Sequence, residues 1–245
     1  MESDGLDRFL QAFVRAEAGN APPRPGLRPF LTISRQAGAG GHTLACAVLA
    51  TLERESDAAW RGWKVFDQGV CSRIAEDPGL RAMLEAALQA QGLALAGDYA
   101  APSLPGATPY EIVARKLFRT VRSLACAGKA VILGRAGCVV ARELPAGVHV
   151  RLVGPPAWRA HRVARELGLD VEDAARWMRQ QDDARRRLFR GRFRREIDDP
   201  FLYDAILDSE RSSFDELASA VVALLKARAA RLSEEERVGL LSAGG

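Results

Sequence analysis

The chain has 245 residues, of which 48% are hydrophobic, 27% charged and 7% aromatic. An apolar fraction near one half, with charges of both signs, excludes a chain that is disordered throughout. No run approaches the ~18 to 20 consecutive apolar residues that a membrane-spanning helix needs, so no membrane span is expected. The four cysteines are scattered and the first residues are acidic, which predicts a cytoplasmic protein with reduced thiols.

Arginine carries almost all of the positive charge, since all but four of the 35 basic residues are of this type. A net charge of +4 is compatible with binding to nucleic acid. However, 31 acidic residues are interspersed among the basic ones. A nucleic acid is therefore not the expected partner.

The first 29 residues are predicted to form a helix and a connector outside the main body. Residues 5–18 carry apolar side chains at helical spacing, namely Leu6, Phe9, Leu10, Phe13 and Val14. A proline-rich connector follows and ends near Pro29. This helix either packs on the main body or forms the contact of a homodimer, and the sequence leaves both interpretations open.

The main body begins with a strand, a glycine-rich turn and a helix. Phe30–Ile33 is β-prone, residues 34–43 contain three glycines, and a helical pattern runs over residues 44–53. This order is typical of the first βα unit of nucleotide-binding α/β folds.

Strands and helices continue to alternate along the chain. Further strands are predicted at residues 64–66, 130–133, 148–153 and 201–207, and helices up to about residue 91 and at 110–127, 157–195 and 213–229. The remainder, residues 229–245, is expected to be a C-terminal tail that is frayed beyond Arg231. The alternation predicts an α/β fold with a doubly wound parallel sheet.

The glycine-rich turn is a candidate phosphate-binding loop. Gly38, Gly40 and Gly41 allow successive backbone N–H groups to point at one anion at the positive end of a helix. Compared with the pattern GxxxxGK[ST], Gly41 stands at the lysine position and His42 at the hydroxyl position, with Thr43 one place later. By itself this composition fits a tight turn without a ligand equally well.

The loop Ser34-Arg35-Gln36-Ala37-Gly38-Ala39-Gly40-Gly41-His42 resembles the SRxxGSGG loop of the cytidylate kinase-like family, relatives of the bacterial cytidylate kinases. Later segments match that family in order, at residues 65–68, 133–137, 182–185, 203–204 and 207–209. The resemblance spans about residues 30–226. The chain departs from the family at His42, where a fixed cation is usual, whereas the P-loop lysine is often absent in the family too.

The resemblance implies a P-loop fold of the nucleoside monophosphate kinase type over residues 30–228. Within this core it implies an acceptor-binding insert at about residues 68–128 and a helical lid at about residues 170–200. The implied activity is ATP-dependent phosphoryl transfer to a nucleoside monophosphate, with CMP or dCMP as the expected acceptor. ATP and Mg²⁺ are the implied cofactors.

The resemblance also implies roles for individual residues at the donor phosphates. The donor phosphates would contact the loop residues Gly38, Ala39, Gly40, Gly41, His42 and Thr43. Thr43 is the candidate Mg²⁺ ligand, and either Arg35 or His42 would replace the absent lysine.

Further roles concern the acceptor and the lid. Arg135 is assigned to the acceptor phosphate, since arginine binds phosphate with a planar fork. Asp67 and Asp183 are further candidate contacts of the acceptor, although Asp67 is equally suited to cap a helix. Arg179 and Arg185 are the candidate lid cations, which Asp182 and Asp183 could orient.

Two other functions remain open at this stage. The absent lysine also fits a catalytically impaired nucleotide-binding regulatory or scaffold protein. The diverged residues 92–109 also fit a kinase for a different small phosphate acceptor.

Overall fold

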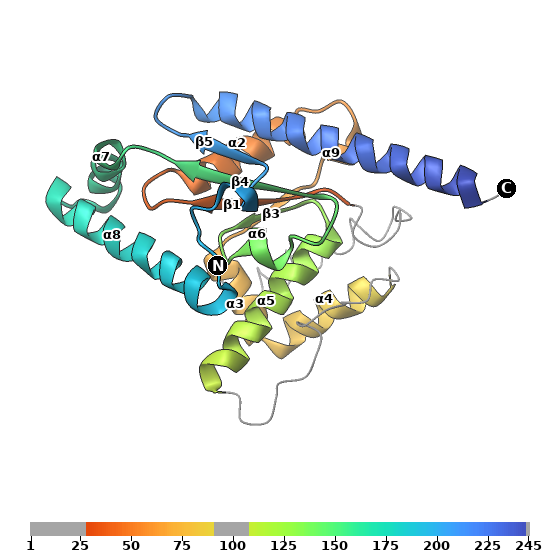
Figure 1. The fold of residues 1–245 in the computed structure, drawn as a ribbon, viewed down its shortest axis with the longest axis horizontal. Helices are drawn as coiled ribbons and strands as arrows, with labels where there is room; N and C mark the ends of the chain where they lie inside the picture. Colours follow the sequence, from red (N-terminus) through yellow and green to blue (C-terminus); the bar gives the residue numbers. More distant parts are fainter. Residues whose placement is uncertain (1–27, 91–107, 244–245) are drawn as a thin grey trace.

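A parallel five-stranded sheet forms the centre of the protein in a computed structural model that describes residues 28–90 and 108–243 (Figure 1). The strand order is β2-β3-β1-β4-β5, and every neighbouring pair is parallel. The strands are β1 (Phe30–Arg35), β2 (Lys64–Phe66), β3 (Ala130–Leu133), β4 (Gly147–Val153) and β5 (Ala205–Asp208). The predicted α/β fold is confirmed. The predicted helix at residues 5–18 lies outside the described residues, as do residues 92–107 of the glycine-rich stretch.

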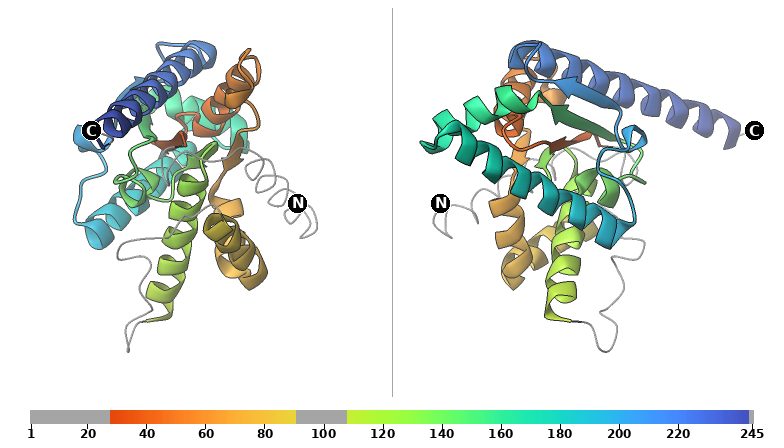
Figure 2. Two further views of the ribbon diagram at one scale, coloured as in Figure 1. Left: turned by 90° about the vertical axis from the view of Figure 1, so that its right-hand side faces the viewer. Right: turned by 60° about the vertical axis from the view of Figure 1, so that its left-hand side comes forward.

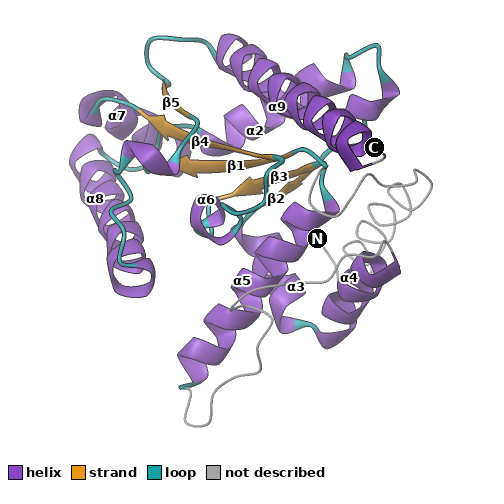
Figure 3. Ribbon diagram, turned by 45° about the vertical axis from the view of Figure 1, so that its right-hand side comes forward, coloured by secondary structure: helices purple, strands orange, loops and turns teal. Residues whose placement is uncertain are grey.

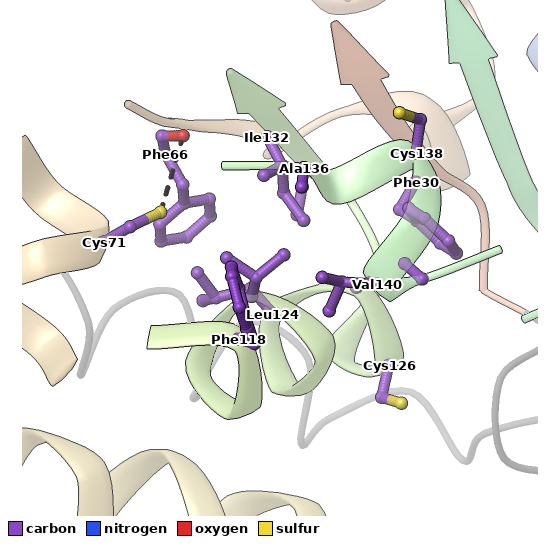
Figure 4. Close-up of a cluster of buried hydrophobic side chains, with 14 of the residues drawn as sticks. Phe30, Phe66, Cys71, Phe118, Leu124, Cys126, Ile132, Ala136, Cys138 and Val140 are labelled. Atoms are coloured by element: carbon purple, nitrogen blue, oxygen red, sulfur yellow. Dashed lines mark hydrogen bonds between the residues drawn. The ribbon is translucent and has the colours of Figure 1, made fainter. Parts of the chain in front are cut away.

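Helices cover both faces of the sheet (Figure 3). One face packs against α2 (Gly41–Glu53) and α9 (Phe214–Ala243) through side chains such as Leu31 and Val150. The other face packs against α3 (Gln68–Glu76), α5 (Pro109–Ala127) and α6 (Gly137–Val140), and α4 (Pro78–Ala90) packs on α3 and α5. Figure 4 shows this second core, where Phe30, Phe66 and Ile132 of the strands meet Phe118 and Leu124 of α5.

A pair of antiparallel helices, α7 (Pro156–Leu167) and α8 (Val171–Leu188), follows β4 at one side of the sheet (Figure 2). The predicted single helical stretch over residues 157–195 is therefore divided. Gly168 ends α7 with a φ of +67°, and the Asp170 side chain caps α8 by accepting from the Asp173 N–H at 2.7 Å. A single π-helical turn, Phe189–Phe193, follows α8.

Two predicted boundaries near the end of the chain are wrong. The last strand begins at Ala205, because Pro200–Leu202 forms a 3₁₀ turn in which the Asp199 side chain accepts from the Phe201 N–H at 2.9 Å. The closing helix was expected to end at residue 229, but α9 continues to Ala243 and extends beyond the sheet (Figure 1). No proline interrupts α9, and its first glycine is Gly239, so nothing in the local sequence stops the helix where the tail was expected. No helix among the described residues is long and apolar enough to cross a membrane.

His149 is a buried titratable group in the centre of β4. It is 5% exposed, and its Nδ1 lies 2.7 Å from Thr32 Oγ1. Burial holds the pKa of His149 below its ordinary value of 6.5, although the Asp204 carboxylate opposes this effect. Burial lowers this pKa to about 4, so between about pH 4 and 6.5 the unfolded chain binds a proton that the folded protein does not bind. The free energy of unfolding therefore falls as the pH falls below 6.5.

We expect His149→Gln to remove part of this acid sensitivity, and His161→Gln, at an exposed position, to leave it unchanged. Urea unfolding of the three proteins between about pH 7.5 and 5 measures the dependence. The same pH dependence in all three proteins would show that His149 does not cause this acid sensitivity.

Candidate functional site

Three arginines from different elements line one cavity at the carboxyl ends of β1 and β3. Arg35 ends β1, Arg135 follows β3, and Arg185 belongs to the last turn of α8. The cavity has a volume of about 100 Å³, and we call it the arginine cavity. Its other lining residues are Thr32, Ser34, Gln68, Gly134, Ala136, Gly137, Cys138, Leu188, Phe189 and Ile197. Open α/β sheets bind their ligands at this edge.

Arg35 lies between the turn that follows β1 and the turn that follows β3. A Cβ added at Gly41 would lie 3.0 Å from Arg35 Cγ, so the aliphatic stem passes directly beside that glycine. A Cβ added at Gly134, whose φ is +79°, would collide with Arg35 Nη1. Burial, followed by repulsion from Arg185 and Arg135, lowers the pKa of Arg35 to about 10. Arg35 is therefore charged at neutral pH and adjoins the position where the P-loop pattern has lysine.

Arg135 is held by the first turns of α3. Its Nη2 donates to Ser72 Oγ at 2.8 Å and to the Gln68 carbonyl at 3.3 Å, whereas its Nε is buried without a hydrogen-bond partner. Burial lowers the pKa of Arg135, and the Asp67 carboxylate opposes this effect. Asp67 itself caps α3 by accepting from the Val70 N–H at 2.8 Å, as the helix-cap interpretation predicts.

Arg185 reaches the cavity from α8. Its Nη1 donates to Asp182 Oδ1 at 2.9 Å and to the Arg35 carbonyl at 3.3 Å. Burial lowers the pKa of Arg185, and the attraction of Asp182 opposes this effect. The side chain is thus half-buried and oriented by a carboxylate.

Two other candidates from the same helix are not brought to the cavity. Arg179 is exposed, and Asp183 is half exposed and pairs with Arg186 at 2.9 Å. Residues 179 and 183 are four apart and share a helix face, whereas the face that contains Met178 and Asp182 is buried. Neither Arg179 nor Asp183 lines the arginine cavity.

The glycine loop, which we define as residues 36–41, packs closely against its surroundings. Gly38 has a φ of +75°, and an added Cβ would lie 2.7 Å from Val163 Cγ2 and 2.8 Å from the Arg159 carbonyl. Gly40 has a φ of +85°, and an added Cβ would collide with the Phe214 ring. Gly40 is the N-cap of α2, so the first N–H groups of that helix face the loop without intrahelical partners. These groups can bind an anion.

His42 and Thr43 begin α2 but differ in their partners. His42 is exposed, and its Nδ1 lies 3.6 Å from Cys46 Sγ. Thr43 Oγ1 accepts from Arg162 Nη2 at 2.7 Å. The hydroxyl proposed as a Mg²⁺ ligand is therefore already bound to a guanidinium, which does not fit a direct contact with the metal.

The sequence reasoning missed Arg159 and Arg162 of α7, which both reach the glycine loop. Arg159 Nη1 donates to the Ala37 carbonyl at 2.7 Å. The Arg162 guanidinium lies beside Gly40, where an added Cβ would be 3.1 Å from Arg162 Cζ, and it is 5.0 Å from the Phe214 ring centre. Their spacing of three residues, directly after the carboxyl end of β4, is the only signal in the sequence. It places them on one face of a helix next to the ligand-binding edge.

The fold and the arginine cavity define an α/β protein with a candidate anion site at the carboxyl edge of a parallel sheet. The family model of the cytidylate kinase-like family matches residues 30–211. The chain belongs to this family.

One similar solved structure supports the fold. A crystal structure of an uncharacterized protein from Eubacterium ventriosum aligns with a TM-score of 0.60 and 16% identity, covering 81% of this chain and 99% of that one. A crystal structure of TT1252 from Thermus thermophilus has the same identity and covers 81% and 97% of the two chains, with a TM-score of 0.37. A search of curated proteins finds no match.

Gly134→Ala tests the position of the Arg35 guanidinium. We expect the added methyl group to displace Arg35 and to weaken pyrophosphate binding by about tenfold or more, the loss of one charge-assisted contact. Isothermal titration calorimetry with pyrophosphate measures this. Gly62→Ala is the matched control, because Gly62 has a φ of +80° with nothing within 4 Å of an added Cβ. Equal pyrophosphate affinities in the two variants would show that the position of Arg35 is irrelevant to binding.

Proposed function

We propose that the protein transfers a phosphoryl group from ATP to a nucleoside monophosphate, with CMP or dCMP as the preferred acceptor. The observation that carries the proposal is the convergence of Arg35, Arg135 and Arg185 in one cavity. Three half-buried guanidiniums without a carboxylate among the lining residues favour a polyanion as the ligand. The preference for cytosine rests on the family alone.

The donor phosphates would lie against the glycine loop and the N-terminus of α2. Of the two candidates for replacing the absent lysine, the geometry favours Arg35. Its stem runs beside Gly41 and its guanidinium lies in the cavity, whereas His42 is exposed beside Cys46. Arg35 would thus supply the cation that a P-loop lysine supplies at the β and γ phosphates.

The other two guanidiniums suit the acceptor and the transferred group. Arg135 has a buried Nε without a partner, which a phosphate oxygen of the acceptor would satisfy. Arg185 comes from the opposite side, on α8, and would neutralise charge on the transferred phosphoryl group. Phosphoryl transfer needs this positioning and charge neutralisation more than it needs covalent help from the protein.

Magnesium would reach the site with the nucleotide. When bound, it neutralises phosphate charge and orients the phosphates. Among the described residues no cluster of three or more His, Cys, Asp or Glu side chains could hold a metal ion. The Thr43 hydroxyl is bonded to Arg162, so we assign no protein ligand to the ion.

A second candidate function is nucleotide binding without catalysis, as in a regulatory or scaffold protein. It is favoured by Gly41, which contributes no ammonium group, and by the engagement of Thr43 with Arg162. It predicts nucleotide-dependent thermal stabilisation without formation of ADP.

The decisive measurement is ADP formation by purified protein with ATP, Mg²⁺ and a panel of nucleoside monophosphates. We expect turnover that is highest with CMP or dCMP. Arg35→Gln and Arg185→Gln should each lower kcat by roughly 10² to 10³, the usual effect of removing one group that stabilises the transition state. Arg187→Gln, an exposed position on the same helix as Arg185, is the control and should retain activity. Absence of turnover with every acceptor would contradict the enzyme proposal, and stabilisation by ATP would then favour the second candidate.

A further inference from the structure

A buried carboxylate connects the glycine loop to the helix that carries Arg185. Asp182 is 9% exposed. Its Oδ1 accepts from the Ala37 N–H at 2.7 Å and from Arg185 Nη1 at 2.9 Å. Its Oδ2 accepts from Arg159 Nη1 at 2.9 Å. One side chain of α8 therefore contacts the loop, α7 and a cation of the arginine cavity.

Asp182 occupies a position on α8 that would otherwise be apolar. The buried residues of this helix are Ala174, Met178 and Asp182, which recur every four residues and face α7 and the loop. A carboxylate in this stripe loses its hydration, and that loss is offset only because three donors surround it. If Asp182 served packing alone, an apolar side chain at this position would serve equally well.

The Arg159–Asp182 pair holds Ala37 from both sides of its backbone. Asp182 accepts from the Ala37 N–H, while Arg159 donates to the Ala37 carbonyl at 2.7 Å. Arg159 Nε also donates to the Gly154 carbonyl at 2.9 Å, and the Gly154 N–H donates to Gln36 Oε1 at 3.1 Å. The beginning of the glycine loop is thereby fixed to α7 and to the end of β4.

We propose that Asp182 is a positioning residue that sets the glycine loop and the Arg185 guanidinium relative to each other. The same oxygen, Oδ1, bonds the loop N–H and Arg185, so a shift of either group disturbs the bond to the other. The part of this proposal that concerns nucleotide affinity rests on the proposed function. The part that concerns the loop backbone does not.

Asp182→Asn tests the proposal because it retains the shape of the side chain and removes its charge. Asp173→Asn is the matched control, since Asp173 pairs with Arg176, also three residues later on α8, but at the surface. We expect Asp182→Asn to accelerate hydrogen exchange of residues 34–41 and to raise the Kd for ATP by about tenfold or more. We expect Asp173→Asn to change neither quantity.

A double-mutant cycle separates positioning from general destabilisation. If Asp182 acts through Arg185, Asp182→Asn should weaken ATP binding much less in an Arg185→Gln background than in the wild type. Fully additive losses would overturn the coupling, and unchanged exchange at residues 34–41 would overturn the link to the loop.

Failure of this proposal can be distinguished from failure of the proposed function. If the wild-type protein binds no ATP, the proposed function fails, while the exchange measurement still tests the contact between Asp182 and Ala37. If Asp182→Asn does not fold, Arg159→Lys tests the same link, because it keeps the charge and removes the fork that bonds Ala37 and Asp182. Faster exchange at residues 34–41 is then the supporting result, and unchanged exchange the contrary one.

Discussion

The lack of space around the glycine loop determines how the rest of the site is arranged. Gly38 lies against α7, Gly40 against Phe214 of α9, and Gly41 against the stem of Arg35. A loop enclosed in this way has little room to change its backbone conformation. Helices α7 and α9, which are far apart in sequence, both pack against the loop.

The three arginines of the cavity also repel one another. Burial lowers the pKa of Arg35, Arg135 and Arg185, and repulsion from the other two contributes further for Arg35. Asp67 and Asp182 compensate in part, from just outside the cavity. Such an arrangement is unfavourable for the protein alone and becomes favourable with an anion between the guanidiniums. This is the expected property of a binding site and not of a stabilising ion-pair network.

The sequence predicts local features of this molecule well and contacts between distant segments poorly. Strands β1, β3 and β4 are found because they are rich in apolar and β-branched residues, and the glycine loop because its three glycines stand between a strand and a helix. The choice between Arg185 and Arg179 depends on which face of α8 is buried, and that face is set by packing on α7. The contacts of Arg159 and Arg162 with the loop depend on how α7 folds back after β4, which no local pattern specifies.

The position of Arg35 has a consequence for how proteins of this kind are recognised. Its stem lies 3.0 Å from where the first side-chain carbon of residue 41 would begin. A side chain at residue 41 would therefore press on this stem, and the arginine would have to shift by a few tenths of an ångström to admit it. A search that requires the lysine would pass over a chain that carries an arginine on the preceding strand and a glycine at this position.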